Sequence, residues 1–284
     1  MQLQQIANFN GLANGSRATA EIPNYANSLG KVQLQLSGSL TKATVTEIVM
    51  RIGSRAFFGP ISAVDFDKIM AYRGHPANAN FLSLDLCERD MFVQWQRELG
   101  AVDLPLLGRQ SVFVEVLNNA ASGNPGLVGL SGLLPRQFVD SDKDGKATRH
   151  EQLMHKLLRY SLPNTGTRYV WQPVFGGAQI KRVHFFYTGA DWTATANGNL
   201  VSVDVKRNGT SVFDRIQCLP NRFHQTECQK VPQSRVFTVD FIADNDTGKA
   251  LNTAGLRSLE FELQFTASDN VVAYVECLDI PGNL

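Results

Sequence analysis

The chain has 284 residues and a formal net charge of +1, with a pI near 7.7. This length suits one large domain or two of ordinary size. Its 27 lysines and arginines are scattered along the chain rather than clustered, so we expect no direct binding of nucleic acid.

The first fifteen residues lack the charged start and the continuous apolar run of a secretory signal. Leu3, Ile6 and Phe9 recur at roughly helical spacing, which predicts either a short amphipathic arm or a frayed terminus. We therefore expect a protein that is soluble when it is made.

Short alternating or apolar runs, separated by Gly, Asn and Pro, predict that the first half consists mainly of β-strands. The predicted strands cover residues 17–23, 31–37, 44–52, 55–58, 79–86 and 111–118. Two helices are predicted between them. The first covers 62–73, where Ser62 suits an N-cap and Gly74 follows the last turn. The second covers 90–99, where Phe92 and Trp95 begin an apolar face.

Residues 119–167 are predicted to join the two halves of the chain. The join begins with Gly123, Gly126, Gly129 and Gly132, a spacing that favours a flexible linker over a phosphate-binding loop. Its last part is predicted to be an amphipathic helix, with an apolar face of Leu153, Met154, Leu157 and Leu158.

The second half repeats the first at low resolution. Its predicted strands cover 168–175, 180–187, 199–206, 235–242, 257–265 and 271–278. Val32 and Leu34 reappear as Val183 and Phe185, and the order of the matching segments is kept. Two copies of one β-unit predict an all-β protein made of two tandem jelly-roll β-sandwiches, with short helices in the loops. The predicted divisions are 1–135 for the first jelly roll, 136–167 for a linker with an acidic loop and a helix, and 168–284 for the second.

One short motif in the join matches a calcium-binding loop. Carboxylates at the first, third, fifth and twelfth positions, with a glycine at the sixth, can converge on one hard cation. The predicted calcium ligands are Asp140, Asp142, Asp144, Lys146 through its carbonyl, Thr148 and Glu151. The alternative is an acidic linker that is simply solvated.

The remaining chemistry-bearing residues do not form a catalytic pattern. His150 and His155 are five residues apart, whereas the histidines of a zinc-protease helix are four apart. The cysteines at 87, 218, 228 and 277 follow no metal-binding spacing, which favours free thiols in a reducing compartment. We therefore expect that the protein is not an enzyme.

Several segments of the chain resemble a known family of viral proteins. They are Asn14-Gly15-Ser16 with Glu21, Ile22 and Pro23, the runs 32–38, 48–53 and 81–86, Leu99-Gly100-Ala101, the lead-in to Ile180, Val183 and His184, and the last run 271–277. Together they are similar to the double jelly-roll major capsid proteins of tailless icosahedral bacteriophages with an internal membrane, the corticovirus and tectivirus type.

This resemblance implies a structural role in a virus. It implies homotrimers whose six jelly rolls form a pseudo-hexagonal capsomer, contacts with neighbouring capsomers, and contacts with the internal viral membrane or minor capsid proteins. It also implies assembly in the host cytoplasm and a final place in the virion capsid. The rival hypothesis is a jelly-roll carbohydrate-binding or receptor-binding spike protein. Such a protein needs an aromatic groove, yet Trp95, Trp171 and Trp192 are spread over both halves.

Overall fold

The computed structural model describes residues 1–6, 8–23, 26–119, 123–135, 139–141, 147–149 and 153–283. It divides into two compact units. Unit 1 comprises residues 1–68, 76–157 and 278–284, and unit 2 comprises residues 69–75 and 158–277.

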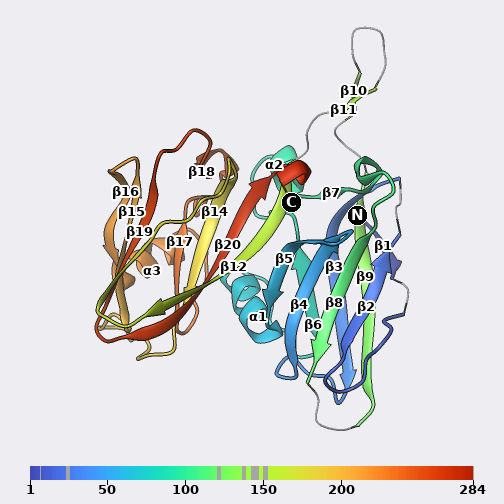
Figure 1. Ribbon diagram of the computed structural model, residues 1–284, viewed down its shortest axis with the longest axis horizontal. Helices are drawn as coiled ribbons and strands as arrows, with labels where there is room; N and C mark the ends of the chain where they lie inside the picture. Colours follow the sequence, from blue (N-terminus) through green and yellow to red (C-terminus); the bar gives the residue numbers. More distant parts are fainter. Residues whose placement is uncertain are drawn as a thin grey trace. The chain divides into compact units, whose positions relative to one another are not determined.

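Unit 1 is a sandwich of two β-sheets (Figure 1). The first sheet has the order β1-β9-β3-β6, with β7 also paired to β3. Its strands are β1 (Gln2–Gln5), β3 (Ser28–Gly38), β6 (Phe81–Asp85), β7 (Val102–Asp103) and β9 (Pro125–Leu134). The second sheet has the order β5-β4-β8-β2. Its strands are β2 (Arg17–Ile22), β4 (Val45–Ile52), β5 (Arg55–Ile61) and β8 (Val112–Asn118).

Unit 2 is built in the same way. One sheet has the order β12-β20-β14-β17, with β18 also paired to β14, and the other has the order β13-β19-β15-β16. The strands are β12 (Met154–Asn164), β13 (Arg168–Trp171), β14 (Gln179–Phe186), β15 (Leu200–Arg207), β16 (Thr210–Gln217), β17 (Val236–Asp240), β18 (Leu251–Asn252), β19 (Leu259–Phe265) and β20 (Asp269–Asp279).

The two units therefore share one topology, strand for strand. Strands β12 to β20 take, in order, the places of β1 to β9, including the short strands β7 and β18, which pair with β3 and β14. Each unit has two principal sheets of four strands, the composition of a jelly roll. The predicted double jelly roll and its internal repeat are confirmed.

Alternate side chains of the strands form the cores of the sandwiches. In unit 1, Val112, Val114 and Val116 of β8 are fully buried. In unit 2, the core includes Trp171, whose ring lies 5.1 Å from that of Phe261. The alternation that the sequence shows is thus the alternation between core and outer face.

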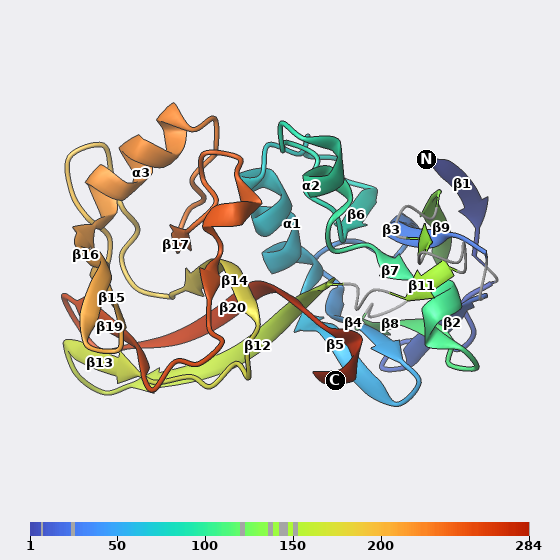
Figure 2. The same ribbon diagram turned by 90° about the horizontal axis from the view of Figure 1, so that it is seen from above.

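Short helices lie in the loops. α1 (Ala63–Tyr72) follows β5, and α3 (Cys218–Glu227) follows β16 at the equivalent place, beside β16 and β17 (Figure 2). The predicted start of α1 is confirmed, because Ser62 Oγ accepts a hydrogen bond from the Asp65 N–H at 3.1 Å. The remaining short elements are α2 (Gln94–Glu98), the 3₁₀ turns η1 (Leu104–Leu107), η2 (Thr247–Lys249) and η3 (Pro281–Asn283), and the hairpin strands β10 (Val139–Ser141) and β11 (Ala147–Arg149). Within the described part of the chain, no helix is long and apolar enough to cross a membrane.

The glycine-rich segment that the sequence predicts to be a linker is a strand instead. It is β9, which pairs with β3 over ten residue pairs from Ser28↔Leu134 to Gly38↔Pro125. Its glycines allow close packing. A Cβ atom at Gly132 would lie 2.5 Å from Lys31 Cγ, and one at Gly129 would lie 3.1 Å from Ile6 Cδ1.

The helix predicted around residues 153–158 is also wrong, because these residues enter strand β12. The first four residues of this strand, 154–157, are all buried. Met154 and Leu157 therefore lie on opposite faces of the strand and are both buried, and their separation of three residues resembles the spacing of a helix face. As β12 fills the first strand position of the second jelly roll, residues 154–164 are part of a sheet rather than of a linker. The helix predicted over 90–99 covers only Gln94–Glu98. Its predicted apolar face is not buried, since Phe92 and Trp95 are 78% and 51% exposed.

Candidate functional site

A buried cluster of charged side chains lies on the outer face of one sheet of unit 2. Arg182 of β14 donates from Nε to Asp240 Oδ2 at 3.0 Å and from Nη1 to Glu276 Oε2 at 2.8 Å. All three side chains are about 1% exposed. Burying ions without partners costs several kcal/mol, so the cluster depends on these pairings.

His184 extends the same cluster along β14. Its Nε2 lies 3.4 Å from Glu276 Oε1, and its Nδ1 lies 2.9 Å from Thr238 Oγ1. Burial disfavours the charged form of Glu276, but Arg182, the contact with His184 and nearby Arg73 hold the pKa of Glu276 well below its usual range. Glu276 is therefore a carboxylate at neutral pH and in mild acid.

Tyr72, the last residue of α1, covers this cluster. Its Oη donates to Asp240 Oδ2 at 2.9 Å, and its ring packs edge-on against the imidazole of His184 with the centroids 5.5 Å apart. Burial and the Asp240 carboxylate raise the pKa of Tyr72 well above its usual value. These buried side chains are thus joined by hydrogen bonds and ring packing within unit 2.

On the equivalent face of unit 1, Lys31 and Gln33 are less buried than Arg182 and His184, whereas the side chain of Asp85 is as buried as that of Asp240. Strand register makes the positions comparable, because Lys31 pairs with Asp85 as Arg182 pairs with Asp240. The Asp85 carboxylate accepts a hydrogen bond from Arg89 Nη2 at 2.9 Å. The two jelly rolls therefore share a topology but differ in how much of this face is covered.

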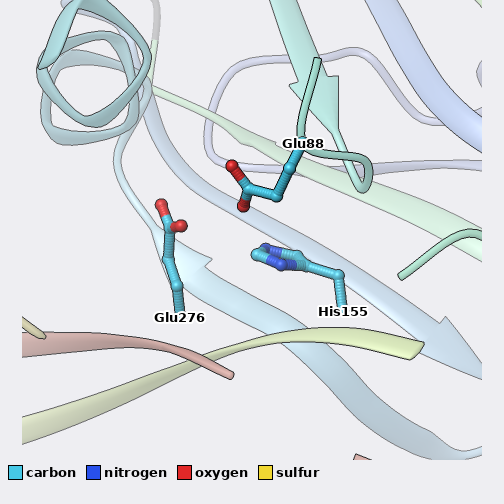
Figure 3. Close-up of side chains that lie close together, drawn as sticks. All are labelled: Glu88, His155 and Glu276. Carbon is cyan, nitrogen blue, oxygen red and sulfur yellow. The ribbon is translucent and has the colours of Figure 1, made fainter. Parts of the chain in front are cut away.

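Glu88 and His155 of unit 1 are both buried, and their side chains point toward one another (Figure 3). Their ligand atoms lie within 4.8 Å. Two ligands are fewer than the four that a structural zinc site uses, so these two residues do not by themselves make a metal centre. Glu276, also labelled in Figure 3, belongs to unit 2 and has the partners described above.

The outer faces of the second sheets hold exposed ion-pair ladders. In unit 1, Glu115 of β8 accepts from Arg17 Nη1 of β2 at 2.9 Å and from Arg51 Nε of β4 at 3.1 Å. Exposed pairs of this kind contribute little individually. They mark the solvent side of the sheet.

Unit 2 has the same ladder. Glu262 of β19 accepts from Arg168 Nε of β13 at 2.7 Å and from Lys206 Nζ of β15 at 3.1 Å. These two bonds, opposed by slight burial, lower the pKa of Glu262 to about 2.

Unit 2 also has a cavity of about 560 Å³ between the loop 172–177 and residues 253–259. One aromatic residue, Phe175, lines it, and the lining contains no carboxylate. Sugar-binding grooves and glycosidase sites use exposed aromatic rings and paired carboxylates. This cavity therefore does not have the chemistry that the carbohydrate-binding hypothesis requires.

The predicted calcium ligands lie mostly outside the described residues, which is the case for Asp142, Asp144, Lys146 and Glu151. Asp140 and Thr148 are described, and they are directly opposed in the β10–β11 hairpin. The elements near the loop are strands, not the helices of a helix-loop-helix site.

The buried cluster around Arg182 was not predicted from the sequence. Arg182 and His184 alternate with Val183 and Phe185, a pattern typical of a strand with one face in solvent. Only the fold shows that both faces of this strand are buried. The four cysteines are free thiols in the structure, as predicted.

Comparison with known proteins places this geometry in a family. The model of the viral coat protein P2 N-terminal domain matches residues 3–133, and that of the viral coat protein P2 C-terminal domain matches residues 154–281. A search of curated protein sequences gives no match.

Solved structures share the fold over almost the whole chain. The major capsid protein P2 of bacteriophage PM2 is similar with a TM-score of 0.78 at 15% identity, over 98% of this chain and 97% of that chain. A chain of Sulfolobus Turreted Icosahedral Virus gives a TM-score of 0.70 at 16% identity, over 99% and 91%. A chain of the PBCV-1 virus capsid gives 0.64 at 11% identity, over 98% and 92%.

Proposed function

Because the chain belongs to the viral coat protein P2 family and serves as a major capsid protein, we propose that three copies assemble into a homotrimer. The supporting observation is the strand-for-strand equivalence of β1 to β9 with β12 to β20. Two equivalent jelly rolls in each chain give six in a trimer, which is the number that a pseudo-hexagonal tile needs. Head-to-tail contacts between copies then close into a ring.

We infer that the tile acts as a coat component and not as a catalyst. Among the described residues, the buried charged groups around Arg182 are paired with one another, and the cavity in unit 2 lacks carboxylates. We infer that neighbouring capsomers join through their rims into an icosahedral shell. We further infer assembly in the host cytoplasm and contacts with minor capsid proteins or an internal membrane on the inner side of the shell.

The test is the oligomeric state of the full-length protein. Light scattering over a wide range of protein concentration should give three times the chain mass of 31.3 kDa. Electron microscopy of the same sample should give hexagonal outlines. A monomer at every concentration, or a closed dimer, would refute the homotrimer.

We also propose that the segment 140–151 binds calcium through Asp140, Asp142, Asp144, Lys146, Thr148 and Glu151. Supporting this, the hairpin register sets Asp140 opposite Thr148, two of the six predicted ligands. Three aspartates within five residues repel one another without a cation. A site of this kind in an extracellular particle binds with a Kd of about 10⁻⁴ to 10⁻³ M.

Calorimetric titration of the wild type and of an Asp140→Ala, Glu151→Ala double variant tests this proposal. The wild type should take up one calcium ion per chain, and its Tm should fall in chelator. The double variant should show neither effect. Equal uptake by both proteins would leave a solvated acidic linker as the correct description.

A further inference from the structure

The outer face of sheet β1-β9-β3-β6 in unit 1 exposes apolar side chains. We call it the unit 1 outer face, and define it by the residues that share one side of the sheet through their register: Leu3, Gln5, Lys31, Gln33, Gln35, Phe81, Ser83, Asp85, Val128 and Leu130. Leu3 is 53% exposed and Val128 is 41% exposed. Its charged members are the partly exposed Lys31 and the buried Asp85, and Asp85 accepts a hydrogen bond from Arg89 at 2.9 Å, so the exposed charge here is positive.

The same face of unit 2 is buried. The strand registers equate Lys31 with Arg182 and Gln33 with His184, because these residues lie opposite Asp85 and Ser83 in unit 1 and opposite Asp240 and Thr238 in unit 2. Arg182 is 1% exposed and His184 is fully buried, whereas Lys31 and Gln33 are partly exposed. At these two positions the face is therefore covered in unit 2 and partly open in unit 1.

The cover in unit 2 comes from the last turn of a helix. Residues 69–75, which contain the end of α1, are part of unit 2 although β5, the preceding strand, is part of unit 1. Tyr72 makes the contacts with Asp240 and His184 given above. The last turn of α1, which is part of unit 2, thus covers the sheet of the second repeat.

The equivalent helix of the second repeat has an exposed last turn. α1 and α3 each have ten residues and each follow the fifth strand of their repeat, so Glu227 corresponds to Tyr72. Glu227 and His224 are exposed, and Phe223 is 68% exposed. Tyr72 and Ile69, at the positions of Glu227 and His224, are 1% exposed.

We propose that the last turn of α3 in one copy covers the unit 1 outer face of a second copy, as Tyr72 covers the equivalent face of unit 2. This proposal rests on the homotrimer and names its contact. Phe223 supplies apolar area to Leu3 and Val128, and the Glu227 carboxylate is complementary in charge to the Lys31 ammonium group.

The contact is heterologous, since it joins unit 2 of one copy to unit 1 of the next. Repeated around a ring, it uses every α3 and every unit 1 outer face once. In each of the six jelly rolls, the last turn of a helix then covers the outer face of the same sheet. A closed ring leaves no copy with an exposed face, which explains why the assembly stops at a fixed number of chains.

A charge exchange in the full-length protein tests the contact. Lys31→Glu and Glu227→Lys each place like charges together, so each should raise the dissociation constant of the trimer about tenfold or more. The double variant Lys31→Glu, Glu227→Lys should restore trimers to within about threefold of the wild type. Arg109→Glu is the control, because it makes the same charge change at an exposed residue of unit 1 outside this face.

Hydrogen exchange on the wild type gives a second readout that needs no substitution. Amides in the last turn of α3 and in β1 and β3 should exchange more slowly in the trimer than in diluted, dissociated protein. A trimeric wild type whose assembly is unaffected by both single changes, with no added protection at these amides, would overturn the contact and leave the trimer standing. A wild type that is never trimeric would overturn both.

Discussion

Glu115 and Glu262 occupy the same position in the two jelly rolls, and each accepts hydrogen bonds from a basic side chain on either neighbouring strand. Glu115 lies opposite Thr19 and Val49, and Glu262 lies opposite Val170 and Asp204. The repeat therefore extends beyond the backbone to a charge pattern on the outer face. This pattern aligns three strands in each sheet.

The first prediction concerns the pH dependence of the Glu262 ladder. The pKa of Glu262 is lowered to about 2 from its usual value of 4.5 by the bonds from Arg168 and Lys206. A carboxyl whose pKa falls on folding stabilises the fold above its unfolded pKa, and this contribution is lost as the pH falls from 4.5 toward 2. Glu262→Gln should therefore lower the free energy of unfolding at pH 7 by about 0.5 to 1 kcal/mol in low salt, and by less in high salt.

Urea unfolding of the wild type and the variant at several pH values measures this difference. The gap between them should narrow as the pH falls from 4.5 toward 2, where Glu262 is about half protonated in the folded protein. Glu21→Gln, at an exposed residue of unit 1, is the control and should have little effect. A gap that is independent of both pH and salt would contradict the electrostatic explanation.

The second prediction concerns Asp269, which ties the start of β20 to the loop after β14. Its carboxylate accepts hydrogen bonds from the Thr188 N–H and hydroxyl, the Gly189 N–H and the Asn199 side chain. Burial opposes the charged form, but these bonds lower the pKa of Asp269 below its usual value. Asp269→Asn replaces one acceptor oxygen with an amide N–H₂, which then faces other hydrogen-bond donors. The substitution should therefore lower the free energy of unfolding by about 2 kcal/mol.

The comparison variant is Asp214→Asn on the exposed strand β16, which should cost less than about 0.5 kcal/mol. Because the pKa of Asp269 falls on folding, the cost of Asp269→Asn should shrink as the pH falls below the usual pKa of aspartate, 3.8. Equal costs for the two variants would show that the hydrogen bonds of Asp269 do not stabilise the loop.

The sequence predicts the fold well where one face of a strand is in the core and the other in water. Val112, Val114 and Val116 alternate with less buried residues, and the predicted strand over 111–118 is β8. Prediction fails where tertiary packing buries both faces, as at the start of β12, or where a strand is rich in glycine, as in β9.

The cluster around Arg182 could not be predicted for a related reason. Its members come from positions 72, 182, 184, 240 and 276, so no local spacing relates them. Helix α3 was not predicted either, because Pro220 and Asn221 in its first turn have low helix propensity. In the fold, Asn221 and Gln225 both donate to the Thr238 carbonyl at 2.7 Å, which fixes the helix on β17.

The third prediction concerns the aromatic core of unit 2. Phe261 is fully buried, and its ring lies 5.1 Å from Trp171 and 6.1 Å from Phe185. Phe261→Ala should cost about 3 to 5 kcal/mol, through lost burial and the cavity that remains. Val170→Ala, at a residue 41% exposed on the adjacent strand, should cost less than about 0.5 kcal/mol. Trp171 fluorescence during urea unfolding measures both, and a small loss for Phe261→Ala would mean that the core refills the space.

The last prediction concerns the buried ion pairs of Arg182. Arg182→Met removes the positive charge between Asp240 and Glu276 and leaves two carboxylates buried without their main partner. Breaking a buried pair in this way costs about 3 to 5 kcal/mol. Arg168→Met, at a side chain 61% exposed in the surface ladder, should cost less than about 1 kcal/mol.

The pH dependence separates a charge effect from a packing effect. In the wild type, Arg182 helps to hold the pKa of Glu276 well below its usual range, so protonation in mild acid does not occur. Without Arg182 the pKa of Glu276 should rise, because burial then dominates and favours the neutral acid. The destabilisation of Arg182→Met should therefore decrease as the pH falls from 7 to 5, since the variant can protonate Glu276 and relieve the unpaired charge. A loss that is the same at both pH values would assign the effect to packing alone.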